Sequence, residues 1–348
     1  MNLQNVFMNK VLFIILMGCL AFSFSIDTDR SDHELTLVYP EDWPEPVYDF
    51  RSNPITENGF KLGRALFHDQ KLSRDGTISC ASCHSQYNAF THVDHNVSHG
   101  IEDRKGTRNS PALINLAWNR NFHWDGGVNN LEMQPLNPLS HHAEMDNKLE
   151  DALLYLNNDQ KYRKLFFDAF GDSTVNTKYF LKAIAQYTAS LVSANSDYDK
   201  YKRGEIEFNQ QQENGYTLFK KHCDQCHTEP LFCSNRFANN GLGMDSNYMD
   251  VGRYKITNDP KDSLQFKIPT LRNIAYTFPY MHDGRFSKLK QVMNHYVEGI
   301  DPHNNYLSDE LKSPIKLNGD EQKDLIAFLL TLSDKEFMFN RRFNPRIE

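Results

Sequence analysis

The chain has 348 residues, of which 39% are hydrophobic and 12% aromatic, and its formal net charge is -7. This apolar content excludes a disordered polymer and is enough for two modest cores, and the usual size of a domain favours two domains. The acidic balance lacks the broad basic field that neutralises phosphates, so we expect no nucleic-acid partner.

The N-terminus carries the one strongly apolar run of the chain, Val11 to Phe24, with Lys10 before it and a polar stretch after it. This layout predicts an export signal over residues 1–25. The alternative is a lipoprotein signal ending before Cys19, because Leu16-Met17-Gly18-Cys19 resembles a bacterial lipobox. In both cases we expect a mature protein outside the cytoplasm, in the periplasm, either free or held by a lipid anchor.

After a Pro-rich segment, apolar residues at helical spacing over 62–67 lead to a cysteine motif, Cys80-Ala81-Ser82-Cys83-His84. Residues 88–110 are rich in His, Asn, Asp and Gly and show no sustained period, which predicts a long functional loop. Apolar residues three and four apart then predict amphipathic helices over 147–170 and 177–193.

The charged stretch 197–207 is typical of a linker between domains. A new helical run from Tyr216 leads into a second motif, Cys223-Asp224-Gln225-Cys226-His227, so the chain repeats its own plan. A last helix is predicted over 321–332, with Asn318, Gly319 and Asp320 as candidate caps. No strand pattern stands out.

Both cysteine motifs have the form C-x-x-C-H, the attachment sequence of haem c. Two thiols one helical turn apart add to the vinyl groups of the haem, and His84 or His227 reaches the iron as proximal ligand. A zinc site would need further ligands, which the leftover Cys19 and Cys233 do not supply. The sequence therefore predicts two covalently bound haem c groups and a mostly α-helical fold with two cytochrome c-like domains, residues 26–205 and 206–348.

Four further blocks surround the two motifs. They are Gly106-Thr107-Arg108-Asn109-Ser110-Pro111, Phe122-His123-Trp124-Asp125-Gly126, Pro269-Thr270-Leu271-Arg272-Asn273 and Pro279-Tyr280-Met281-His282-Asp283-Gly284. In this order, and together with the haem motifs, they resemble the bacterial di-haem cytochrome c peroxidase/MauG family. The resemblance runs from Leu62 to Leu332.

The resemblance implies a peroxide-reacting site. In that family a tryptophan lies between the haems, and a Gln, a Pro and a Glu at fixed spacing after it line the peroxide pocket. The matching residues are Trp124, Gln134, Pro138 and Glu144. Glu144 is then the acid/base that moves a proton between the oxygens of peroxide, Gln134 its hydrogen-bonding partner and Trp124 the electron relay.

The resemblance also implies iron ligands beyond the two motif histidines. Where the second haem of many relatives has a Met ligand, this chain has Tyr296, as in tyrosine-ligated MauG, with Met293 as the rival ligand. His99 matches a loop histidine that blocks the first haem at rest in many peroxidases. Tyrosine-ligated relatives tend to have that haem open, so resting ligation by His99 remains undecided.

The family further holds a calcium ion between its domains, and the matching residues are Asn109, Thr277 and Pro279. Cys233 departs from the family pattern, in which a small hydroxyl residue is common at this position. We expect it to be a buried, inert thiol.

Three functions are compatible with these patterns. The first is an oxidoreductase that reduces hydrogen peroxide to water with electrons from an external donor, such as a small cytochrome c or a cupredoxin. The second is a MauG-like enzyme that oxidises residues of a partner protein, and the third is a non-catalytic di-haem electron carrier. Gln134 and Glu144 argue against the carrier, while Tyr296 favours the MauG-like enzyme. The oligomeric state stays open, although homodimers are common in the family.

Overall fold

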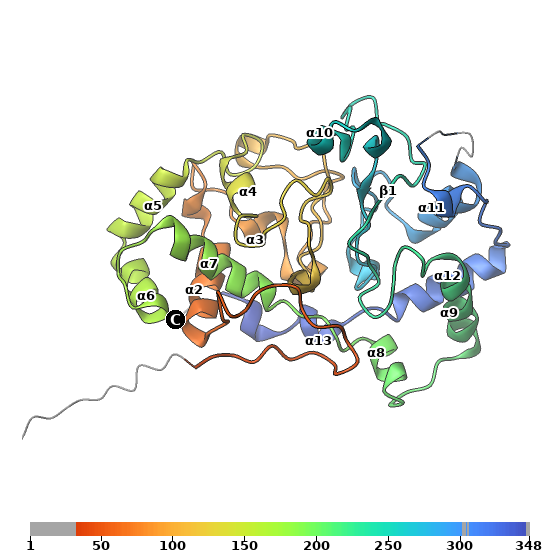
Figure 1. Ribbon diagram of the computed structural model, residues 1–348, viewed down its shortest axis with the longest axis horizontal. Helices are drawn as coiled ribbons and strands as arrows, with labels where there is room; N and C mark the ends of the chain where they lie inside the picture. Colours follow the sequence, from red (N-terminus) through yellow and green to blue (C-terminus); the bar gives the residue numbers. More distant parts are fainter. Residues whose placement is uncertain (1–32, 301–303, 305, 346–348) are drawn as a thin grey trace, which may run out of the picture. The chain divides into compact units, whose positions relative to one another are not determined.

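The computed structural model describes residues 33–300, 304 and 306–345. The predicted export signal, residues 1–25, and Cys19 lie outside the described residues. From Glu34 on, the chain forms one compact unit, in which long loops connect the helices (Figure 1). Among the described residues, no helix is long and apolar enough to cross a membrane.

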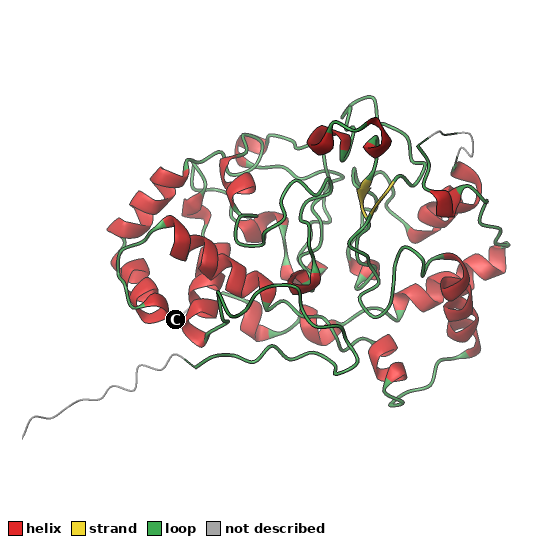
Figure 2. Cartoon of the chain, in the orientation of Figure 1, coloured by secondary structure: helices red, strands yellow, loops and turns green. Residues whose placement is uncertain are grey.

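Helices dominate the secondary structure (Figure 2), which confirms the mostly α-helical prediction. The α-helices of the described residues are α2 (Glu57–Phe67), α3 (Cys80–Cys83), α4 (Leu136–Ser140), α5 (Leu149–Asn158), α6 (Gln160–Phe170), α7 (Thr177–Ala189), α8 (Asp197–Lys202), α9 (Gln210–His222), α10 (Tyr254–Thr257), α11 (Leu289–Asn294), α12 (Gly319–Leu330) and α13 (Lys335–Met338). Strands β1 (Phe237–Ala238) and β2 (Phe266–Lys267) pair antiparallel, with Phe237 opposite Lys267. The sequence did not predict this ladder, because two residues are too few to show the alternation of a strand.

Each half of the chain contains a pair of helices that cross at a glycine. A Cβ atom at Gly63 in α2 would lie 2.0 Å from the carbonyl oxygen of Ala183 in α7. A Cβ atom at Gly215 in α9 would lie 1.9 Å from the carbonyl oxygen of Asp324 in α12. Only glycine permits these backbone approaches. The helix that leads into each cysteine motif is therefore fixed in the same way, as the repeated plan of the sequence predicts.

Three clusters of buried side chains stabilise the unit. Two lie in the N-terminal half, and one lies in the C-terminal half, where α9 packs on α12. The first N-terminal cluster also takes in side chains from the end of the chain, namely Phe337, Met338 and Phe343. The last residues thus pack into a core formed mainly by the first half.

Residues 197–207, expected to be a charged linker, begin with helix α8 instead. Its Asp199 is buried and accepts two hydrogen bonds of 2.8 Å from the guanidinium of Arg272, which is itself fully buried. The charge pattern could not reveal this ion pair, because its partners lie 73 positions apart.

Candidate functional site

Both C-x-x-C-H motifs fold into a single helical turn. In the first, α3, the His84 N–H donates to the Cys80 carbonyl oxygen at 3.0 Å. In the second, which follows α9, the His227 N–H donates to the Cys223 carbonyl oxygen at 2.9 Å. Each motif therefore presents two thiols and one imidazole from one turn, as haem c attachment requires.

A backbone carbonyl orients each motif histidine. Nδ1 of His84 lies 2.9 Å from the Phe90 carbonyl oxygen, and Nδ1 of His227 lies 3.0 Å from that of Pro269. A carbonyl can only accept, so Nδ1 carries the proton and Nε2 keeps its lone pair. Burial lowers the pKa of both imidazoles to about 4. Both are therefore neutral at pH 7, with Nε2 available to iron and Nδ1 held as metal-bound histidines usually are.

A cavity of about 750 Å³ receives both motifs. Cys83 and His84 line it from the first motif, and Cys223, Cys226 and His227 line it from the second, whereas Cys80 packs against the N-terminal cores. Most other predicted site residues line the same cavity: Asn109, Trp124, Gln134, Pro138, Glu144, Thr277, Pro279, Met293 and Tyr296. His99 does not.

The chemistry of the cavity wall fits two haem groups. Three of the four motif thiols and both neutral imidazoles reach a mostly apolar space, which suits the attachment and burial of a porphyrin. Lys267 also lines the cavity, where burial lowers the pKa of its ammonium. A haem propionate is a carboxylate, the natural counter-ion for this lysine.

Part of the wall consists of two copies of one loop, residues 122–128 and 280–286. In each copy the first N–H donates to the last carbonyl oxygen at 2.7 Å. The second residue has a positive φ in both, 64° at His123 and 75° at Met281. The fifth residue is a glycine with positive φ, where a Cβ atom would lie within 2.2 Å of another atom. The glycines of the W-D-G and H-D-G blocks are therefore required by the fold.

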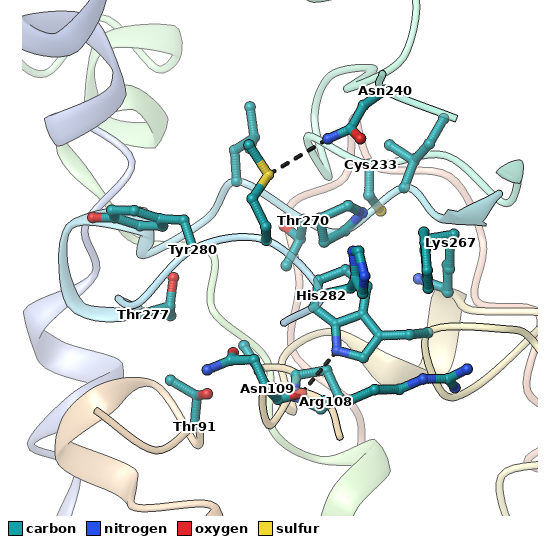
Figure 3. Close-up of a pocket in the computed structure, with 18 of the residues that line it drawn as sticks. Thr91, Arg108, Asn109, Cys233, Asn240, Lys267, Thr270, Thr277, Tyr280 and His282 are labelled. Atoms are coloured by element: carbon teal, nitrogen blue, oxygen red, sulfur yellow. Dashed lines mark hydrogen bonds between the residues drawn. The ribbon is translucent and has the colours of Figure 1, made fainter. Parts of the chain in front are cut away.

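Trp124 is held by both halves of the chain. Its indole N–H donates to the Asn109 carbonyl oxygen at 2.8 Å, one of the dashed bonds in Figure 3. Its own carbonyl oxygen accepts from the Lys267 N–H in β2 at 2.7 Å. Nearby, Arg108 joins the halves again through hydrogen bonds of 2.6 and 2.8 Å to Asp250. Trp124 thus occupies a fixed position where the two halves meet.

Glu144 lies close to the first motif: burial raises the pKa of the Cys83 thiol, and the nearby charge of Glu144 raises it further. Burial raises the pKa of Glu144 itself to about 7. Its Oε1 is 3.5 Å from Nδ1 of His141. A carboxyl group with this pKa can both give and take a proton at neutral pH, which is what a general acid/base needs.

The hydrogen bond found for Gln134 leads to His123 rather than to Glu144. Nε2 of Gln134 lies 3.4 Å from Nε2 of His123, and Nδ2 of Asn137 lies 3.3 Å from its Nδ1. Burial lowers the pKa of His123, and the neutral ring has one donor and one acceptor nitrogen. An amide nitrogen only donates, so one amide donates to the ring, and the other must turn its oxygen toward the ring to accept from it. Our sequence reasoning missed His123, although it stands beside the tryptophan of the W-D-G block.

Three residues near the second motif could serve as its iron ligand. Tyr296 lies in a π-helical turn after α11 (His295–Gly299), a feature often found at functional sites, and it is hydrogen-bonded to Asn240. Burial raises the pKa of its phenol to about 12. Met293 is buried and lines the cavity. Met281, which sequence reasoning did not consider, also lines it and accepts a hydrogen bond of 3.5 Å from Asn240 (Figure 3).

The three residues expected at calcium, Asn109, Thr277 and Pro279, all line the cavity. The Asn109 amide nitrogen donates to the Asn96 carbonyl oxygen at 3.0 Å, which leaves its Oδ1 as the side-chain atom suited to a cation. In Figure 3 the amide of Asn109 points toward the side on which Thr277 lies.

Cys233 lines the cavity, and burial raises the pKa of its thiol. The thiol therefore stays protonated at neutral pH.

The geometry defines a c-type protein in which two haem-attachment turns open into a shared cavity. Residues 57–207 match the sequence model of the di-haem cytochrome c peroxidase family. The methylamine utilization protein MauG of Methylorubrum extorquens is 33% identical over 300 residues, which cover 84% of this chain and 82% of that protein. The cytochrome c551 peroxidase of Nitrosomonas europaea is 32% identical over 294 residues, covering 83% of this chain and 84% of that protein.

Among solved structures, a MauG-like protein associated with microbial copper homeostasis superposes with a TM-score of 0.82 at 31% identity, covering 90% of this chain and 100% of that one. The chain belongs to the di-haem cytochrome c peroxidase/MauG family, and it is an oxidoreductase with two haem c groups.

Proposed function

We propose that this protein reduces hydrogen peroxide to water, using electrons that enter at the second haem and pass by Trp124 to the first. The observation that carries the proposal is the position of Glu144, whose carboxyl group lines the cavity that holds the first motif, where burial raises its pKa. A pure electron carrier has no use for such a group, because its reaction moves no proton.

The haem groups supply the iron that binds peroxide and the redox centres that accept and store electrons. The protein's own side chains handle the protons. Glu144 takes a proton from the inner oxygen of peroxide and returns it to the outer oxygen, which then leaves as water. Gln134 and His123 line the same pocket as a linked polar pair and orient the substrate.

Trp124 is the proposed electron relay, because its indole is hydrogen-bonded to Asn109 and its backbone to Lys267, so it has contacts with both halves. One turnover consumes one peroxide, two electrons and two protons and yields two waters. The electrons come from an external donor such as a small cytochrome c or a cupredoxin.

A second candidate function is oxidation of residues on a partner protein, as in MauG. Tyr296 favours this function, since a phenolate ligand at the second haem would stabilise oxidised iron. The relatives are named both as MauG and as cytochrome c peroxidases, so their names fit either function. We place peroxide reduction first because Glu144 supplies the proton transfer that this reaction requires.

The test is Glu144→Gln in the protein loaded with both haems. We expect peroxide-dependent oxidation of a reduced cytochrome c to fall by about 10²–10⁴-fold, because the amide cannot shuttle a proton. Glu150→Gln, at an exposed glutamate in the first turn of α5, is the matched control and should keep the wild-type rate. Equal rates for wild type and Glu144→Gln, or no turnover in wild type, would reject the proposal.

We also propose a calcium ion held by the side chain of Asn109 and by backbone carbonyls at Thr277 and Pro279. The support is that all three residues line the same cavity. Amide and carbonyl oxygens are ligands that Ca²⁺ prefers.

We further propose the organisation that the sequence predicts. An export signal over residues 1–25 would deliver the protein to the periplasm, with Cys19 as the site of a lipid anchor if the lipoprotein alternative holds. The haem domains would be residues 26–205 and 206–348. The protein would form a homodimer, as is common in the family.

A further inference from the structure

Three histidines of the loop after the first motif gather outside the cavity described above. One imidazole nitrogen from each of His92, His95 and His99 lies within 4.8 Å of one from each of the other two. Their ring centroids are 4.4 to 5.5 Å apart. None of the three lines the cavity that holds the haem motifs. The cluster is therefore a separate group of nitrogen donors.

The state of His92 suits ligation. Its Nδ1 is buried and has no hydrogen-bond partner among the described residues. A buried polar nitrogen without a hydrogen-bond partner is uncommon in folded proteins, and a metal ion would supply the missing partner.

His99 is oriented by a carboxylate. Its Nδ1 lies 3.0 Å from Oδ1 of Asp103, so this nitrogen donates to the carboxylate and Nε2 is the nitrogen available to a metal. A histidine that donates one N–H to a carboxylate while its other nitrogen binds a metal is a recurrent arrangement in metalloproteins. Asp94 and Asp103 also add two negative charges beside the three imidazoles, which favours a cation.

We propose that His92, His95 and His99 form a binding site for a divalent late transition metal, with Cu²⁺ bound more tightly than Zn²⁺. Three imidazoles suit these ions, whereas Ca²⁺ and Mg²⁺ prefer oxygen ligands. Metal–nitrogen distances of about 2.0–2.1 Å need donor atoms about 3.3 Å apart in a tetrahedral site. The donor atoms lie within 4.8 Å of one another, so metal binding would have to draw them closer by side-chain rotation within the loop.

The site has a consequence for the neighbouring haem pocket. A histidine has two ring nitrogens, so His99 with Nδ1 on Asp103 and Nε2 on the metal has none left for the first haem. The same loop is joined to Glu144, whose carbonyl oxygen accepts from the Ile101 N–H at 2.9 Å. A metal at this site thus holds His99 away from the haem.

The experiment titrates the protein carrying both haems with Cu²⁺ or with Zn²⁺ in buffer that contains excess Ca²⁺. Bound metal is counted against haem iron by mass spectrometry, and the Cu²⁺ resonance is examined for nitrogen couplings. We expect one equivalent of metal per two haem irons. His92→Ala and His95→Ala should each weaken binding on the order of 100-fold, and Asp103→Asn about tenfold.

His142→Ala is the matched control, since it removes an exposed histidine of the same half and leaves the cluster intact. It should bind metal as the wild type does. Haem absorption and circular dichroism report whether each variant is folded, independently of metal binding. The proposal is overturned if the folded wild type binds no equivalent at micromolar metal, or if His92→Ala and His95→Ala bind as tightly as wild type.

Discussion

Glu144 and Tyr296 line the same cavity, and burial raises the pKa of both side chains. The raised pKa favours the role expected of Glu144 but opposes the role expected of Tyr296. Burial raises the pKa of Glu144 to about 7, which favours proton exchange at neutral pH. Burial also raises the pKa of Tyr296, to about 12, and so opposes the phenolate that would bind iron. Ligation by Tyr296 therefore depends on the positive charge of the iron to ionise the phenol.

Tyr296→Phe tests this ligand. If the phenolate binds the second haem, we expect the low-spin signal of that haem in electron paramagnetic resonance to be lost or shifted, because phenylalanine offers no ligand atom. Tyr280→Phe is the matched control, since Tyr280 lines the same cavity and burial raises its pKa to the same value, about 12. An unchanged spectrum in Tyr296→Phe, with a changed one in Met293→Leu or Met281→Leu, would assign the ligand to methionine.

Helix α8 shows how one element is held by a distant residue. Asp199 in its first turn closes a capping box with Ser196 and pairs with Arg272, whose guanidinium also donates to the Pro230 carbonyl oxygen. Burial alone would raise the pKa of Asp199, but the hydrogen bonds and charge of Arg272 outweigh it and hold the pKa below its usual value. Helix α8 thus depends on the buried ion pair between Asp199 and Arg272.

Asp199→Ala should lower the free energy of unfolding by about 3–5 kcal/mol, because it leaves the Arg272 charge buried without its partner. Asp197→Ala, at an exposed aspartate in the same turn, should cost about 0.5 kcal/mol or less. Denaturant unfolding followed by circular dichroism measures both.

The direction in which stability changes with pH follows from the lowered pKa of Asp199. Its contribution to stability is complete above the usual aspartate pKa and disappears as the pH falls through the lower value of the folded state. The difference in the free energy of unfolding between wild type and Asp199→Ala should therefore narrow only in strong acid. If Asp197→Ala lowered the free energy of unfolding as much as Asp199→Ala does, the result would contradict this account.

At the scale of the whole molecule, the end of the chain stabilises its beginning. Met338 of α13 is fully buried in an N-terminal core, and the carbonyl oxygen of Phe343 accepts from the Tyr187 hydroxyl at 3.0 Å. The Arg64 guanidinium donates to the Arg342 carbonyl oxygen at 2.6 Å. These contacts join segments that are far apart in the sequence.

Met338→Ala should destabilise the protein by about 2–5 kcal/mol, because it opens a cavity in a packed core. Phe339→Ala removes a neighbouring side chain that is 59% exposed and should have a much smaller effect. Thermal unfolding compares the two variants. Similar melting temperatures for both would mean that the C-terminal segment adds little to the N-terminal core.

Local patterns in the sequence determined much of this protein. The C-x-x-C-H spacing specifies a helical turn with two thiols and an imidazole, and the structure has that turn at both motifs. Apolar periodicity predicted the helices over 147–170, which the structure divides at Asp159 into α5 and α6, and Asn318 caps α12 as expected. These features depend on contacts within a few residues, so one stretch of chain contains all the information they need.

Tertiary structure alone decided the rest, because burial and long-range pairing depend on residues that the sequence does not place side by side. The raised pKa of Glu144, the contact of Gln134 with His123 and the presence of Met281 near Tyr296 all follow from the way the halves enclose one cavity. The same holds for His99, whose motif suggested a haem ligand but whose ring lies with His92 and His95. Its partners became visible only once the loop was folded.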